Sequence, residues 1–214
     1  MNLKRILLRY FLPFFLSFAT LSVLSLNGSF QKVIYPFFEN FAITALNNDF
    51  EDTYFKAKPK GPTTDLNYNN ISVLFQSKRT LTAIMEEARR TNSRASYDYL
   101  GFNITVDETF VAPLIFFLCL LLFSPGSWKN KAIAFVLGSL LILGFSYLII
   151  HFKGLYMVSK SGVRDLAYNE NDINFFQFLH FFFSGITIVT VVLLTWILVA
   201  FRKSDLVKFM EQYK

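Results

Sequence analysis

The two histidines of this sequence are the residues best suited to proton transfer near physiological pH. His151 follows the apolar stretch 132–150, and His180 lies five residues into the apolar stretch 175–201. An imidazole changes charge near physiological pH, so either side chain can bind a substrate or transfer a proton. If the two stretches cross a membrane in opposite directions, both histidines reach the same interface. There we expect an outer-face polar cluster that they form with three further ionisable residues, Asp107, Glu108 and Lys153. The alternative is that each histidine ends a helix at headgroup level and contacts water.

Other reactive groups indicate no familiar enzyme. The sequence has no glycine-rich phosphate loop, no paired-histidine zinc pattern and no nucleophile with a base nearby in sequence. Its single cysteine, Cys119, lies in the middle of an apolar run, where a thiol is inert. One cysteine also excludes an intrachain disulfide and a cysteine-based metal site. We therefore expect no catalytic residue, no metal and no cofactor.

The composition is typical of a membrane protein. Of 214 residues, 53% are hydrophobic, 27 are phenylalanine and only 17% are charged, whereas soluble domains have about 25% charged residues. Four apolar stretches occur, at 10–26, 110–123, 132–150 and 175–201. A membrane-spanning helix needs roughly 20 apolar residues. The second stretch reaches that length if it extends to Trp128, whose indole suits a membrane interface. We predict four transmembrane helices.

The distribution of charge predicts the topology. The segments before the first stretch, between the second and third, and after the fourth carry a net charge of +7, and the two remaining loops carry −1. This is the positive-inside pattern, so both termini should be cytoplasmic in a multi-pass protein of a bacterial inner membrane. The basic balance then reflects topology and attraction to anionic lipid, so we expect a lipid bilayer as partner and no nucleic acid. The alternative for the first stretch is a cleavable signal peptide.

The predicted fold class is membrane α, a four-helix transmembrane bundle with a small α+β extracytoplasmic module inserted between helices 1 and 2. Inside the module, alternating and helical patterns predict strands at 52–58, 70–77 and 97–106 and a helix at 80–90. An amphipathic helix at 31–47 precedes it. The expected domains are 1–48 (first span and outer helix), 49–108 (module), 109–202 (spans 2–4) and 203–214 (cytoplasmic amphipathic tail).

The outer module is too small to fold without help from the membrane helices or a partner. It is rich in aromatic residues, which are favoured at the centres of interfaces. We expect these side chains to be exposed and to bind another integral membrane protein: Tyr54, Phe55, Tyr68, Phe75, Tyr97, Tyr99 and Phe102. Small residues are expected where the spanning helices pack closely: Ala134, Gly138, Gly144, Ser184 and Gly185.

One part of the chain resembles a known family. The segment 111–131 begins Val-Ala-Pro-Leu, ends Ser-Pro-Gly-Ser-Trp-Lys-Asn-Lys and continues into the apolar stretch 132–150. It resembles a helical hairpin of the exosortase/archaeosortase superfamily, and the overall layout resembles small membrane proteins that accompany some bacterial exosortases. Enzymes of that superfamily use a catalytic cysteine with arginine and histidine near the outer membrane face. Because Cys119 lies mid-span and no arginine lies within a span, the resemblance implies an accessory subunit and not a peptidase.

Two functions follow as hypotheses. The first is a non-enzymatic membrane subunit that scaffolds an envelope complex, for instance an exosortase-type protein-sorting system, with the outer module contacting a protein or polymer. The second is a small transporter or a membrane enzyme acting on lipid, with a site at His151 and His180. No Asp, Glu, Lys or Arg lies in the middle of a predicted span, which counts against an ion-coupled transporter. We favour the first hypothesis.

Overall fold

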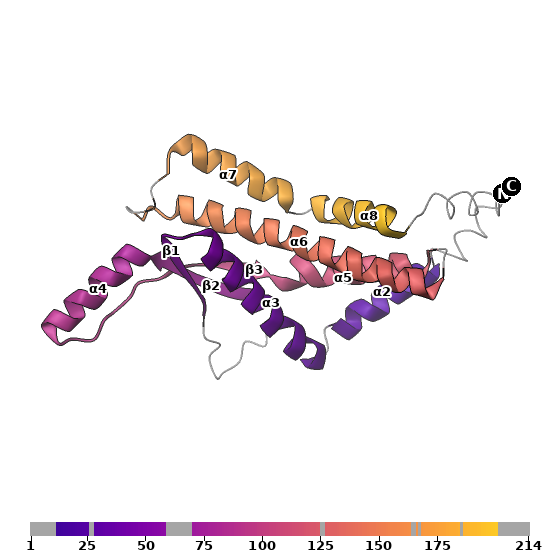
Figure 1. Ribbon diagram of the computed structural model, residues 1–214, viewed down its shortest axis with the longest axis horizontal. Coiled ribbons are helices and arrows are strands. Elements are labelled where there is room, and N and C mark those ends of the chain that lie inside the picture. The colour runs from indigo at the N-terminus through magenta and orange to yellow at the C-terminus, as the bar shows by residue number, and fades with distance from the viewer. Residues whose placement is uncertain are drawn as a thin grey trace. The chain divides into compact units, whose positions relative to one another are not determined.

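The computed structural model describes residues 12–25, 28–58, 70–124, 127–163, 166, 168–184 and 186–200. This part of the chain is mostly helical, with one small sheet (Figure 1). The elements in chain order are α2 (Leu12–Ser25), α3 (Gly28–Asp49), β1 (Thr53–Ala57), β2 (Asn70–Ser77), α4 (Lys78–Thr91), β3 (Leu100–Thr105), the π-helix η2 (Asp107–Val111), α5 (Ala112–Leu122), α6 (Trp128–Lys160), α7 (Glu170–Phe183) and α8 (Ile186–Ala200). The predicted tail 203–214 lies outside the described residues.

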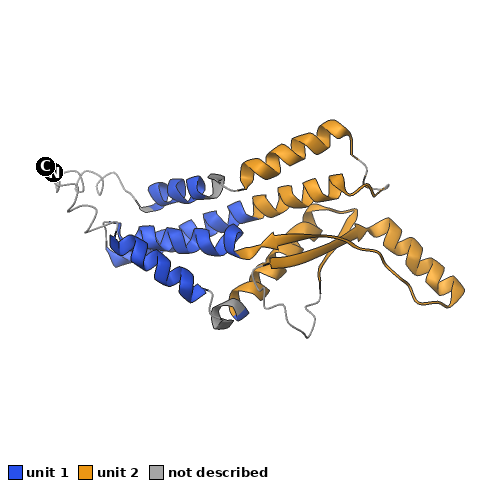
Figure 2. Cartoon of the chain, turned by 180° about the vertical axis from the view of Figure 1, so that it is seen from behind, with its two compact units in different colours: residues 1–32, 107–146, 185–214 blue, residues 33–106, 147–184 orange. Residues whose placement is uncertain are grey.

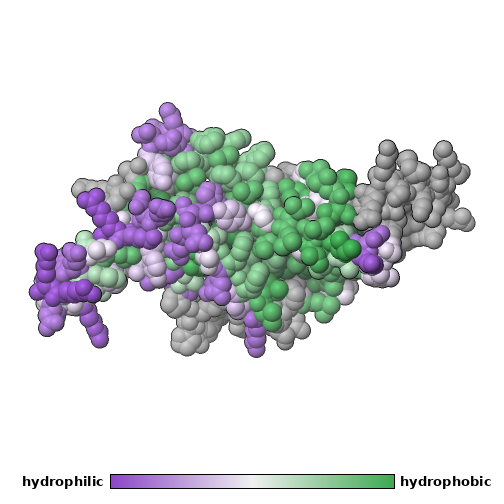
Figure 3. All heavy atoms as spheres, viewed as in Figure 1, coloured by the Kyte–Doolittle hydropathy of each residue, from purple (hydrophilic) through white to green (hydrophobic). Residues whose placement is uncertain are grey.

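The chain divides into two compact units (Figure 2). Unit 1 comprises residues 1–32, 107–146 and 185–214, and unit 2 comprises residues 33–106 and 147–184. Hydrophobic residues gather over α2, α5 and the first part of α6 in unit 1, and hydrophilic residues gather over α4 and the strands of unit 2 (Figure 3). Unit 2 also has an apolar part, because its helix α7 exposes Phe175, Phe178, Phe181 and Phe182.

Unit 1 is built around α5, which packs against both α2 and α8. The side chain of Phe117 in α5 is fully buried and lies against Gly138 of α6. On the side of α2, the ring of Phe116 makes edge-to-face contacts with Phe14 and Phe18 at centroid distances of 5.5 and 5.7 Å. The indole of Trp196 in α8 donates a 2.6 Å hydrogen bond to the Ser124 hydroxyl. Aromatic packing and polar contacts such as this one therefore hold the helices together.

Unit 2 contains an antiparallel sheet with the strand order β1-β2-β3. One face is buried because alternate residues point to it: β2 buries Ile71, Val73, Phe75 and Ser77. The rings of Phe55 in β1 and Phe75 in β2 lie directly opposite and stack at 5.8 Å. The sequence prediction of three strands and a helix in this region is confirmed, and β2 has the predicted bounds.

The predicted third strand begins late. Pairing with β2 starts at Leu100, not at residue 97. The reason is that β2 ends at Ser77, which is the N-cap of α4 and accepts a hydrogen bond from the Thr80 amide. The carbonyl of Asp98 instead accepts a 2.7 Å hydrogen bond from the Gln76 side chain. In this register residue 97 would lie beyond the end of β2.

The helices differ from the predicted spans. Among the described residues, α6 alone is long and apolar enough to cross a membrane, with a mean hydropathy of 2.5 over its most apolar window. Its 33 residues give a length of roughly 50 Å. The fourth apolar stretch is not one helix, because α7 ends at Phe183 and α8 begins at Ile186. The helices α2 and α5 have 14 and 11 residues, so the four-span bundle stays a prediction.

Candidate functional site

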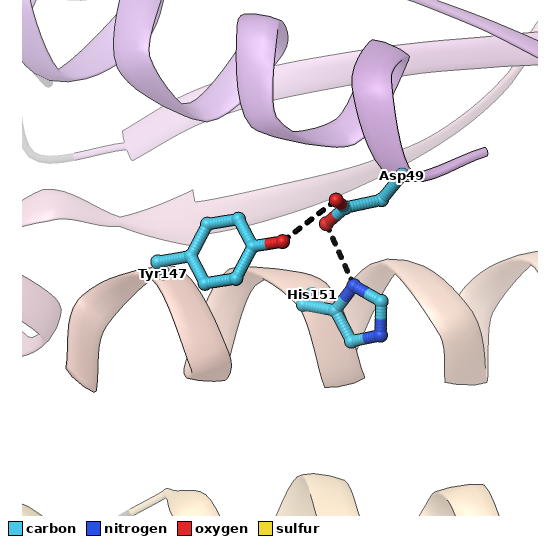
Figure 4. Close-up of polar contacts among 3 residues, drawn as sticks. All are labelled: Asp49, Tyr147 and His151. Carbon is cyan, nitrogen blue, oxygen red and sulfur yellow. Dashed lines mark hydrogen bonds and ion pairs between the residues drawn. The ribbon is translucent and has the colours of Figure 1, made fainter. Parts of the chain in front are cut away.

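A single carboxylate joins two helices of unit 2 (Figure 4). The hydroxyl of Tyr147 donates a 2.6 Å hydrogen bond to Oδ1 of Asp49, and Nδ1 of His151 lies 2.7 Å from Oδ2. Asp49 is the last residue of α3, whereas Tyr147 and His151 are four residues apart in α6 and so share one helix face. We call these three residues the Asp–His–Tyr cluster.

The position of Asp49 is unfavourable by itself. A carboxylate at a helix C-terminus faces the negative end of the helix dipole, which costs about 0.3–1 kcal/mol. The two donors from α6 offset this cost, because hydrogen bonds to a charged group each contribute about 1.5–3 kcal/mol. The side chains of Asp49 and His151 are 16% and 28% exposed, so the pair is only partly shielded from water.

Asn47 fixes the same end of α3 to the sheet. Its side-chain amide donates to the Phe55 carbonyl at 2.9 Å, and its side-chain oxygen accepts from the Phe55 amide at 2.9 Å. The amide also donates to the Ile43 carbonyl in the preceding turn at 3.0 Å. The last turn of α3 is therefore held from two sides, by β1 through Asn47 and by α6 through Asp49.

Gly154 permits the close approach of α3 to α6. A Cβ at this position would lie 2.5 Å from Cδ2 of Leu46 and 3.4 Å from Cε2 of Phe50. Gly154 lies three residues after His151 and seven after Tyr147 in α6, so it shares their face. The absence of a side chain there lets Asp49 come within hydrogen-bond distance of both partners.

Aromatic rings hold the imidazole of His151 in place. Its ring stacks on Phe50 at a centroid distance of 5.5 Å and on Tyr147 at 6.1 Å, and it contacts the edge of Phe152 at 5.3 Å. These contacts, together with the bond to Asp49, leave the ring little freedom to rotate.

The geometry defines what the imidazole can do. In the neutral tautomer whose Nδ1–H donates a hydrogen bond to the carboxylate, His151 keeps a lone pair on Nε2. Nε2 points away from Asp49 (Figure 4) and has no hydrogen-bond partner among the described residues. An aspartate that orients a histidine in this way is the arrangement of a general base. No described nucleophile contacts His151.

His180 has different partners. Its ring stacks on Tyr156 of α6 at 5.7 Å, and its backbone carbonyl accepts a 2.7 Å hydrogen bond from the Ser184 hydroxyl. Lys153 is half-buried in α6. Asp107 and Glu108 lie in η2, which belongs to the other unit. The predicted outer-face cluster of five residues thus stays a prediction.

Sequence reasoning missed two members of the Asp–His–Tyr cluster and misplaced the third. Asp49 lies just beyond the predicted amphipathic helix 31–47, and no sequence motif points to Tyr147. The four-residue spacing of Tyr147 and His151 was the only available signal. The alternative in which His151 ends a helix is wrong, because α6 continues to Lys160, and the imidazole pairs with Asp49.

The predicted partner-binding aromatics separate into two groups. Phe55, Phe75 and Phe102 are only 1%, 2% and 7% exposed, so the expectation that they are accessible is wrong. They point to the buried face of the sheet and form its core. Tyr54 is 41% exposed, Tyr97 and Tyr99 are half-buried, and Tyr68 lies outside the described residues.

The predicted packing residues also differ among themselves. Ala134 and Gly138 are buried, and Gly138 lies against the ring of Phe117. No described atom lies within 4 Å of a Cβ built on Gly144, so this glycine provides no close helix contact within the described chain. Ser184 is half-buried after the end of α7, and Gly185 lies outside the described residues.

The described residues contain no group of three or more His, Cys, Asp or Glu side chains that could hold a metal ion. Cys119 is buried in α5. The sequence matches no family model, and no curated protein and no solved structure matches the chain. The resemblance to exosortase-associated membrane proteins therefore stays a prediction.

Proposed function

We propose that this chain is a non-enzymatic subunit of a bacterial inner membrane that scaffolds an envelope complex, with both termini cytoplasmic. The observation that carries the proposal is the apolar face of α6. Val136, Leu137, Leu140 and Leu141 are 59%, 50%, 60% and 49% exposed, and their spacing places them on one side of the helix. A continuous apolar surface of this kind is covered by lipid or by another protein.

Two further helices of unit 1 support the membrane location. Both α2 and α8 carry large apolar side chains that are more than half exposed, namely Phe15, Leu16, Val23, Leu24, Val189, Leu194 and Leu198. Such side chains are costly in water and neutral in lipid. The charge difference of +7 against −1 between the two sets of loops supports the proposed orientation.

The polar face of the sheet module is the proposed partner contact. Tyr54 is exposed in β1, and the ammonium of Lys56 in the same strand lies 3.6 Å from the centroid of the Tyr99 ring. Tyrosine side chains are enriched at the centres of protein interfaces. The partner on this proposal is another integral membrane protein, and the resemblance described above favours an exosortase-type sorting system.

The test is purification of the full chain in a mild detergent, with identification of the membrane proteins that remain bound. We expect a stable partner whose yield falls when Tyr54 and Tyr99 are both replaced by Ala. Tyr168→Ala is the matched control, because Tyr168 is 38% exposed but lies outside the module. Absence of any stable partner, or equal recovery with the control and the double variant, would contradict the proposal.

The Asp49–His151 geometry favours a second candidate function, a membrane enzyme acting on lipid or a small transporter. On this hypothesis Nε2 of His151 takes a proton from water or from a bound substrate. His151→Gln and Asp49→Asn should then abolish complementation of a deletion strain while leaving partner recovery intact. If both variants complement fully, the cluster only joins α3 to α6, and the scaffold function stands alone.

A further inference from the structure

Unit 1 contains a cleft that neither proposed function uses. Its volume is about 420 Å³. Three helices and the π-helix η2 contribute its walls: Phe18 from α2, Glu108 from η2, Ala112, Pro113 and Phe116 from α5, and Val189 and Val192 from α8. Six of these seven side chains are apolar, and Glu108 is the single ionisable group among them.

The backbone at the acidic end of the cleft is unusual. Residues 107–111 form a π-helix directly before α5. Segments of π-helix are rare and are found frequently at functional sites. Here the carbonyl of Thr109 accepts a 2.8 Å hydrogen bond from the buried Ser146 hydroxyl of α6. A side chain of a neighbouring helix thus stabilises the irregular segment that presents Glu108 to the cleft.

The dimensions of the cleft restrict what can enter it. From Glu108 to Phe116 its wall follows the chain for eight residues, which corresponds to roughly 12 Å along a helix. A partner helix is about 10 Å across with its side chains. An extended alkyl chain is much thinner and matches the apolar walls.

Charge restricts the occupant further. Glu108 is exposed and follows another acidic residue, Asp107, at the start of the second predicted span. On the proposed membrane location, this end of the cleft lies at the level of the lipid headgroups. The ammonium of a zwitterionic headgroup there pairs with the carboxylate, whereas a headgroup with a net negative charge is repelled.

We propose that the cleft holds one acyl chain of a phospholipid whose ammonium headgroup pairs with Glu108, as that of phosphatidylethanolamine can. The inference rests on the proposed membrane location and is independent of the partner and of the Asp–His–Tyr cluster. On this inference Glu108 selects the lipid headgroup, and the bound acyl chain contacts α2, α5 and α8.

The full chain is reconstituted in nanodiscs with equal amounts of phosphatidylethanolamine and phosphatidylglycerol and examined by native mass spectrometry. We expect one retained lipid per chain, with phosphatidylethanolamine favoured. Glu108→Gln should reduce that preference about two- to five-fold, the range of an exposed ion pair, and Glu108→Lys should favour phosphatidylglycerol. Glu170→Gln removes an exposed carboxylate outside the cleft and should change nothing.

Ala112→Trp fills the cleft and should remove lipid of both kinds, provided that circular dichroism shows an unchanged helix content. If Ala112→Trp does not fold, the two Glu108 variants still test the inference through the lipid preference. No retained lipid, or a lipid preference that both Glu108 variants leave unchanged, would overturn the inference. Extraction of membranes with carbonate distinguishes a failure of lipid binding from a failure of the proposed function. A chain that is not integral to the membrane is released by carbonate, whereas an integral chain that binds no lipid in the cleft stays in the membrane.

Discussion

Two glycines of α6 should respond in opposite ways to the same substitution. A Cβ added at Gly138 would overlap the ring of Phe117, whose side chain is 0% exposed. A Cβ added at Gly144 would meet no described atom within 4 Å. Both glycines lie in the interior of one helix, so the change in helix propensity is the same at each position. The difference between Gly138→Ala and Gly144→Ala therefore isolates the contact with Phe117.

The size of the effect follows from two terms. Replacing glycine by alanine inside a helix stabilises it by about 1 kcal/mol. Forcing an extra carbon into a packed core costs about 1–3 kcal/mol, and a buried ring that cannot move aside places Gly138 at the upper end of that range. We expect Gly138→Ala to lower the free energy of unfolding by about 2 kcal/mol and Gly144→Ala to raise it by about 1 kcal/mol. Since 1 kcal/mol shifts Tm by about 2–4 °C in a chain of this size, the two variants should differ by roughly 6–12 °C.

Thermal unfolding of the full chain in detergent, followed by circular dichroism, measures this difference. Phe117→Leu removes the ring, so Gly138→Ala should be less costly in that background than in the native one. If Gly138→Ala unfolds at or above the temperature of Gly144→Ala, the close contact between α5 and α6 does not exist. The same conclusion follows if Phe117→Leu leaves the cost of Gly138→Ala unchanged.

Three other variants test separate parts of the chain. Asn47→Ala leaves the Phe55 amide and carbonyl without their side-chain partners and should lower the free energy of unfolding by about 2 kcal/mol; an unchanged midpoint in denaturant would contradict the role of Asn47. Tyr147→Phe removes one of two donors to the carboxylate and should destabilise the chain by about 1.5–3 kcal/mol, while the nitrogen chemical shifts of His151 still report a bonded Nδ1. A cysteine at position 64 in a Cys119→Ser background should react with an impermeant thiol reagent in intact cells, whereas labelling of a C-terminal cysteine alone would invert the proposed topology.

The sheet module could be predicted because its signals are local. Alternating residues predict β2 with its true bounds, and a helical pattern at 80–90 predicts α4, which runs from Lys78 to Thr91. The same alternation separates Tyr54, which is exposed, from Phe55, which is buried. Treating all the aromatics of the module as accessible ignored that two-residue period, so this error could have been avoided from the sequence.

The Asp–His–Tyr cluster could not be predicted because its contacts are distant in sequence. Asp49 lies 98 residues from Tyr147 and 102 from His151. Nothing in either segment indicates that they meet, since the approach depends on the missing side chain of Gly154.

The break in the fourth apolar stretch was hidden for another reason: hydropathy is continuous across it. The backbone turns to an extended conformation at Ser184, whose amide bonds the Phe181 carbonyl.

The contacts of Asn47 also determine where the sheet can grow. Because β1 is an outer strand, its outward amides and carbonyls would normally invite another chain to add alongside and begin aggregation. The Phe55 groups are instead occupied by the Asn47 side chain, and the Thr53 amide bonds the Phe50 carbonyl at 3.1 Å. An incoming strand would have to break these bonds first. The end of α3 thus covers the exposed edge of β1. A partner that extends the sheet by adding a strand must therefore pair with β3.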